Sequence, residues 1–164
     1  MLRAPLSVAF ALVALGASLH SQTTPAAIPD DFAITLARTS CFGACPVYSV
    51  SVDAKGTVTY EGKKFVRVTG HQSDQIPVSQ VAALAATVER IRFFELNDEY
   101  RVIRNADGTT SMVTDLPTTL VTVTIGGRTK RIEDYFGAPD SLKQFEAQID
   151  EAARTKRWVT VPRP

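Results

Sequence analysis

Alternation of apolar and polar residues constrains the fold of this chain more than any other feature. The segments 32–37, 48–52 and 120–125 carry large apolar or aromatic side chains at every second position. Successive side chains of a strand point to opposite faces, so this period indicates strands that bury one face. A doubly wound parallel sheet would need continuously apolar strands alternating strictly with helices, and the chain lacks both. The pattern therefore predicts an antiparallel sheet with one buried face.

Turn signals between these segments predict hairpins. Asp53 to Gly56 forms a turn, because Gly56 can take a positive φ, and residues 58–60 continue as the return strand. We expect a further strand over 65–68. Gly126-Gly127 is a two-residue hairpin signal between 120–125 and its return strand.

Two helices are expected, one after each group of strands. The first begins near Pro77, with Ser79 as its N-cap, and the second begins near Pro139 or Asp140. Each has an apolar stripe at helical spacing. The stripes are Val81, Leu84, Ala85, Val88 and Ile91, and then Leu142, Phe145 and Ile149 with Ala152 or Ala153.

This order of elements predicts the fold class. Hairpins followed by a helix, and then a hairpin followed by a helix, favour an α+β fold. We expect an antiparallel sheet of about five or six strands with both helices packed on one face. Trp158 is expected to clamp the end of the second helix.

The first residues indicate export. Arg3 gives a positive start, and the apolar run Leu6–Leu19 is shorter than the roughly 20 residues that span a bilayer. We interpret residues 1–21 as a signal peptide, 22–31 as a linker and 32–160 as a single domain. The expected location is periplasmic or extracellular, with no membrane span after cleavage.

Charge and motifs exclude several functions. The formal charge is +1, which offers no basic excess for nucleic acid. The local cluster of Arg154, Lys156 and Arg157 is interpreted as a solvated helix end. The chain contains no G-x-S-x-G, H-E-x-x-H, P-loop or G-x-G-x-x-G motif. We therefore expect no cofactor, and the chain is not expected to be an enzyme.

Cys41 and Cys45 are the only cysteines. Free thiols rarely persist in an oxidising compartment, and a turn through Gly43 can bring the two residues to bonding distance. The first interpretation is a structural disulfide that pins the loop between two strands. The alternative is a thiol-redox or copper site that uses Cys41 and Cys45 with His71, which we place in a loop at 70–74; soft thiolates suit Cu(I).

One string of residues resembles a known family. The segment Cys41-Phe42-Gly43-Ala44-Cys45-Pro46-Val47-Tyr48 looks like the signature of a bacterial exported domain-of-unknown-function family, and Glu133 to Pro139 matches a second stretch. The resemblance implies a small exported α+β module and supplies no catalytic residue. The shorter string C-x-x-x-C-P is similar to that of the Sco-type copper chaperones, but there the proline opens a helix, and here it precedes a strand.

The function predicted from these observations is binding. We expect an interaction module of the cell envelope whose partner is an envelope protein or a small ligand. The weak binding candidates are Asp115, Asp134 and Tyr135. The carboxylates of the two aspartates could converge, and Tyr135 lies close to Gly137 in the sequence. Turn and cap roles remain the simpler interpretation of the two aspartates.

Overall fold

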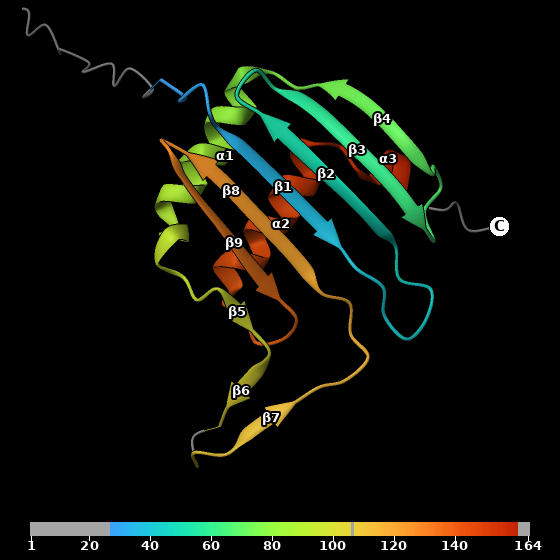
Figure 1. Cartoon of the computed structure of the whole chain (residues 1–164), viewed down its shortest axis with the longest axis vertical. Helices are drawn as coiled ribbons and strands as arrows, with labels where there is room; N and C mark the ends of the chain where they lie inside the picture. The colour runs from blue at the N-terminus through green and yellow to red at the C-terminus, as the bar shows by residue number, and fades with distance from the viewer. Residues whose placement is uncertain (1–26, 106, 161–164) are drawn as a thin grey trace, which may run out of the picture.

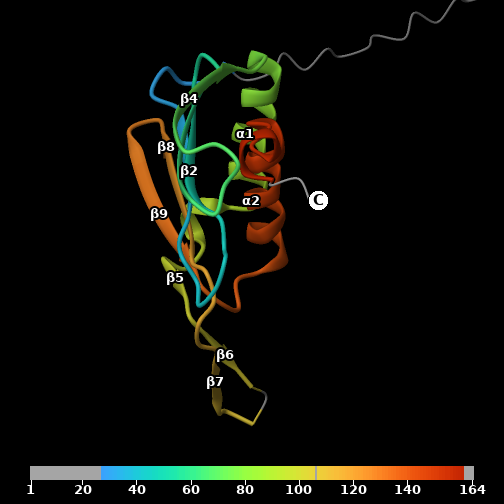
Figure 2. The ribbon, with the colours of Figure 1, turned by 90° about the vertical axis from the view of Figure 1, so that its right-hand side faces the viewer.

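The computed structural model describes residues 27–105 and 107–160. The expected signal peptide, residues 1–21, and the first part of the linker lie outside the described residues. Within the described residues, one sheet carries the helices on a single face (Figures 1 and 2). None of the helices in this part of the chain is long and apolar enough to cross a membrane.

The sheet has seven strands, slightly more than the five or six expected, in the order β4-β3-β2-β1-β8-β9-β5. The central strand, β1, pairs antiparallel with both β2 and β8. Only β5 is parallel to its neighbour, β9. The strands are β1 (Ala33–Arg38), β2 (Val47–Asp53), β3 (Thr57–Lys64), β4 (Gly70–Gln75), β5 (Glu99–Tyr100), β8 (Thr119–Ile125) and β9 (Arg128–Asp134).

The predicted alternation is confirmed in the central strands. Burial alternates along β2 and β8, and every inward apolar side chain enters one core. The turn at Gly56 is also confirmed, with a φ of 82°. A Cβ at this position would lie 2.3 Å from the carbonyl oxygen of Ile76, so only glycine fits.

The helices cover the inward face of the sheet, as predicted (Figure 2). Leu84 of α1 and Leu142 of α2 are fully buried, and Trp158 closes the end of the layer against Tyr60 of β3. Ser79 is not the N-cap of α1, because Pro77 occupies that position. The helices are α1 (Val78–Arg90), a short 3₁₀ turn, η1 (Phe93–Glu95), α2 (Asp140–Ala152) and the single turn α3 (Lys156–Val159).

The expected strand at 65–68 is wrong, and the strand that follows β3 is β4, at Gly70–Gln75. Phe65 has a φ of 54°, a left-handed conformation that ends the extended chain. The sequence of β4 is polar throughout. This edge strand is held by its backbone pairing with β3, so it does not depend on buried apolar side chains. His71 therefore lies in a strand and not in a loop.

A two-stranded ribbon projects from the end of the main sheet (Figures 1 and 2). It consists of β6 (Val102–Arg104) and β7 (Thr110–Met112), paired antiparallel and separate from the seven-stranded sheet.

Candidate functional site

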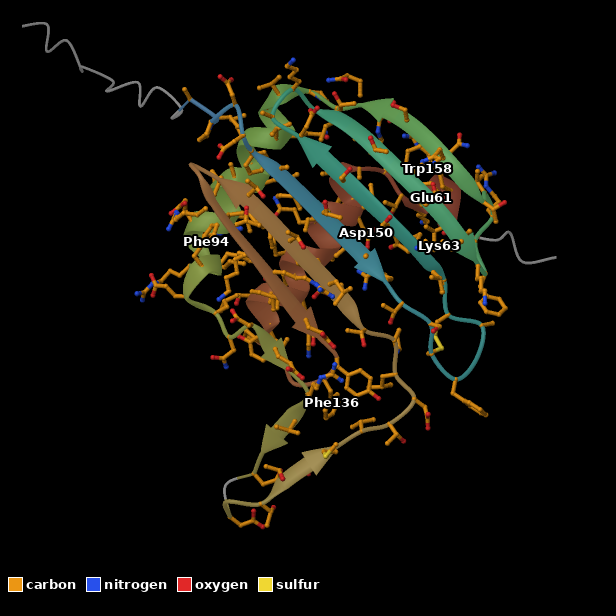
Figure 3. The ribbon with its side chains drawn as sticks, in the orientation of Figure 1. Glu61, Lys63, Phe94, Phe136, Asp150 and Trp158 are labelled. Carbon is orange, nitrogen blue, oxygen red and sulfur yellow. A yellow bond between two sulfur atoms is a disulfide. The ribbon has the colours of Figure 1, made fainter. Side chains whose placement is uncertain are left out.

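The two cysteines form a disulfide in the loop that joins β1 to β2, residues 39–46. Their Cα atoms lie 5.7 Å apart. Both cysteines are half-buried, whereas Phe42, enclosed by the bridge, is 90% exposed. The disulfide, drawn as a yellow bond in Figure 3, thus closes a small loop, and the ring of Phe42 is exposed to solvent.

Hydrogen bonds tie this loop to the segment that follows the ribbon, residues 113–118. The amide of Thr39 donates to the carbonyl oxygen of Thr118 at 3.0 Å, and the amide of Thr118 donates to the Thr39 hydroxyl at 2.9 Å. The amide of Phe42 donates to the carbonyl oxygen of Asp115 at 3.3 Å. We call residues 39–46 together with 113–118 the loop end.

Two further apolar side chains project from the ribbon beside the loop end. Val102 and Met112 are register partners, and they are 39% and 74% exposed. Neither supports the core of the domain. Phe42, Val102 and Met112 are therefore exposed apolar side chains on the loop end and the adjoining ribbon.

A row of polar side chains crosses the sheet directly beneath the loop. Tyr48, Arg38, Thr119 and Asp134 are successive register partners on β2, β1, β8 and β9. The Arg38 guanidinium donates to the Tyr48 hydroxyl at 3.1 Å and to Thr119 Oγ1 at 3.0 Å. Since Arg38 and Tyr48 flank the loop at its two stems, the row holds the stems in place.

Helix α2 places two carboxylates against this row. Asp150 accepts hydrogen bonds from Arg38 Nη2 at 2.8 Å, from the Tyr48 hydroxyl at 2.8 Å and from Thr155 Oγ1 at 2.7 Å. Glu146 lies one turn earlier, with Oε2 3.9 Å from Arg38 Nη1. Asp150 comes from α2 and lies close to the end of β1 (Figure 3).

Glu146 is set up to hold a proton near neutral pH. Its side chain is 6% exposed, and its Oε1 has no hydrogen-bond partner among the described residues. Burial, together with the negative charge of Asp134, raises the pKa of Glu146 to about 7. Burial also raises the pKa of Asp134. A proton held between these carboxyls would satisfy the orphaned oxygen.

The weak binding candidates lie at this end of the sheet but form no single group. Asp134 belongs to the buried row, and the backbone of Asp115 binds Phe42. The Tyr135 hydroxyl accepts a hydrogen bond from the amide of Leu116 at 3.3 Å, and so supports the loop end.

The structure does not gather the residues of the expected metal alternative. His71 Nδ1 lies 2.7 Å from Glu61 Oε2 across the β3–β4 edge. Within residues 27–105 and 107–160, no group of three or more His, Cys, Asp or Glu side chains is placed to hold a metal ion.

Arg38, Tyr48, Thr119, Glu146 and Asp150 were not predicted from the sequence. The signal was present, because Arg38 continues the inward positions of Ile34 and Leu36 with a charge. Likewise Glu146 lies within the apolar stripe of α2, beside Leu142, Phe145 and Ile149. A charged residue at an inward position on several elements indicates a buried polar cluster.

These features define a two-layer α+β domain with a disulfide-closed loop at one end of its sheet. A family model covers residues 32–153 of the chain, and its description is "Domain of unknown function (DUF6438)". The chain belongs to this family. No curated protein matches the chain.

Proposed function

We propose that this chain is an exported binding module and that its loop end contacts a protein of the cell envelope. One observation carries the proposal: Phe42 is 90% exposed on a loop that is closed by a disulfide and hydrogen-bonded to its neighbour. Burial of an aromatic ring is a frequent anchor of protein interfaces. A loop that is rigid before binding loses little conformational entropy when it binds.

The shape of the surface favours a protein partner over a small ligand. Small molecules bind in concave sites, whereas Phe42 and Met112 project from the domain. A partner with an apolar pocket for the ring and a shallow apolar surface for Val102 and Met112 would fit this end. The formal charge of +1 leaves apolar contact as the main attraction.

Export is supported by the first residues and by the disulfide. Residues 1–21 have the composition of a signal peptide, and disulfides persist in oxidising compartments. N-terminal sequencing of the protein from its host tests this directly: an intact Met1 would contradict cleavage.

The rival function is thiol-redox or copper chemistry at Cys41 and Cys45. The half-exposed disulfide favours it, because a reductant could reach the sulfur atoms. A thiol count on the native protein separates the two functions. No free thiol before reduction supports the structural role, whereas two reactive thiols or retained copper support the rival.

Site-specific photo-crosslinking in the intact envelope tests the binding proposal. A photoreactive residue replaces Phe42, Met112 or, as a control, Phe65, which is 53% exposed on the β3–β4 connection. We expect the same protein to be captured from positions 42 and 112 but not from 65. Equal capture from all three positions, or different proteins at 42 and 112, would contradict the proposal.

A further inference from the structure

A basic cavity lies at the junction of α2, α3 and the β3–β4 connection. Its volume is about 680 Å³. Trp158 of α3 (Figure 3) stacks on Tyr60 at 4.8 Å between ring centroids, and Arg157 of the lining lies over its ring. The cavity is lined by Arg67, Asp150, Glu151, Arg154, Lys156, Arg157 and Thr160.

The charges of this cavity do not balance. Four of the seven lining side chains are cationic and two are acidic. Asp150 is already paired with Arg38, and Asp74 at the edge accepts from both Arg154 and Arg157. The lining side chains alone therefore carry a positive excess, and Asp74 at the edge offsets part of it.

Two of the guanidinium groups are held in place before any ligand arrives. Arg154 Nη2 donates to Asp74 Oδ2 at 2.8 Å and to the carbonyl oxygen of Gln75 at 3.0 Å. Arg157 contacts Asp74 as well, and its guanidinium carbon lies 3.9 Å from the centroid of the Trp158 ring. Fixed guanidinium groups bind oxyanions at a smaller entropic cost than free ones.

Stabilisation of the C-terminus of α2 does not account for the cluster. The last turn of α2 contains no basic residue, and the guanidinium of Arg154 reaches β4 rather than the last carbonyl groups of the helix. Arg67 comes from the β3–β4 connection, which is locked to α3 by a hydrogen bond from the amide of Val68 to the carbonyl oxygen of Trp158 at 2.9 Å. Separate segments of the chain therefore bring cations to one place.

We propose that this cavity binds a phosphate group. The net positive charge of the lining suits a phosphate anion, the arginine forks suit its oxygen atoms, and the Thr160 hydroxyl can add a donor. Arg67 and Lys156 are exposed and make no ion pair with the described residues, so they are free to close on the ligand. The cavity shares Asp150 with the polar cluster beneath the loop, but no residue of the loop end lines it.

The fluorescence of the chain's single tryptophan gives a direct test, because Trp158 lies under Arg157. The full protein is titrated with inorganic phosphate at constant ionic strength, with sodium chloride as the reference. The variant Arg67→Ala/Lys156→Ala removes two cations that the fold does not use. The control Lys55→Ala/Arg131→Ala removes two exposed cations elsewhere, so the net charge is matched.

We expect saturable binding of phosphate, with an affinity about tenfold lower in Arg67→Ala/Lys156→Ala and changed by less than about twofold in the control. Equal weakening in both variants would show diffuse charge attraction and overturn the site. Vesicles of phosphatidylcholine mixed with phosphatidylglycerol identify the source of the phosphate. If the protein binds these vesicles and only Arg67→Ala/Lys156→Ala loses this binding, the source is a lipid headgroup. If the protein binds inorganic phosphate but not the vesicles, the source is a free phosphate. Absence of both overturns the proposal.

Discussion

At the scale of single residues, the polar row beneath the loop is the main polar link between the sheet and α2. Arg38 and Asp150 make the closest ion pair of that row, at 2.8 Å, and their side chains are 29% and 20% exposed. Breaking this partly buried pair is costly, because the remaining charge keeps part of its desolvation penalty. The row therefore both holds α2 to the sheet and fixes the loop stems.

The first prediction concerns that ion pair. Asp150→Asn removes the charge but keeps the shape, and we expect the free energy of unfolding to fall by about 2–3 kcal/mol, below the value for full burial because both groups are partly solvated. Urea denaturation measures the change. The control is Asp98→Asn. Asp98 pairs with Lys130 but is 81% exposed, so we expect a loss of less than about 1 kcal/mol. Equal losses in both variants would contradict the role of the row.

The second prediction concerns pH. The pKa of Glu146 is about 7 in the folded protein against 4.5 for the free side chain, so the folded state binds the proton more tightly. The resulting stability is fully present below about pH 4.5 and is lost as the pH rises through about 7, by about 3 kcal/mol in total. Stability should therefore fall between about pH 5 and about pH 8.

Glu146→Gln tests this directly, because the amide cannot lose a proton. For this variant we expect the free energy of unfolding, measured by chemical denaturation, to be nearly constant over the same pH range. Glu151→Gln, at an exposed position of the same helix, should keep the slope of the native protein. A native protein whose stability rises with pH over this range would refute the assignment.

At the scale of elements, the contribution of the disulfide loop to stability and to binding can be measured separately. The chain-entropy model assigns about 2 kcal/mol to so short a loop. We expect Cys41→Ser/Cys45→Ser to lower the free energy of unfolding by that amount or less while the fold remains. Binding of the partner should weaken, because Phe42 then has to be ordered during association. Unchanged binding by the serine variant would show that the bridge does not prepare the loop.

The ribbon is the second such element. Its strands pair only with each other and lie outside the main sheet. Replacing residues 102–112 by a short Gly-Ser linker should change the stability of the domain by less than about 1 kcal/mol, since loop length costs little. The same change should weaken partner binding, as measured by titration calorimetry. A collapse of the fold would show that the ribbon supports the core instead.

The elements that bury apolar residues could be predicted, and those held by backbone pairing could not. The alternation in β2 and β8 predicted the strands, and the stripes predicted α1 and α2. In contrast β4 is wholly polar, so its sequence shows no alternation of apolar and polar residues. Phe65, which precedes β4 in the connection, is apolar but has a left-handed backbone conformation. The parallel pairing of the two-residue β5 likewise has no sequence signal.

At the scale of the whole molecule, strand register explains why the site was harder to predict than the fold. The cysteine pair was visible because its two members are close in sequence. Arg38 and Asp150 are 112 residues apart, and Tyr48, Thr119 and Asp134 meet them only through the register of four strands. Register depends on the whole sheet, so a single sequence does not show which polar residues will share a row.

The central claim is that Phe42 anchors a protein partner, and the affinity of the captured partner tests it most directly. The dissociation constant of the purified pair is measured for the native domain, for Phe42→Ala and for the control Phe65→Ala. An anchor contributes about 2 kcal/mol or more, so Phe42→Ala should weaken binding about thirtyfold while Phe65→Ala leaves it within about twofold. Equal dissociation constants for the native domain and Phe42→Ala would contradict the account.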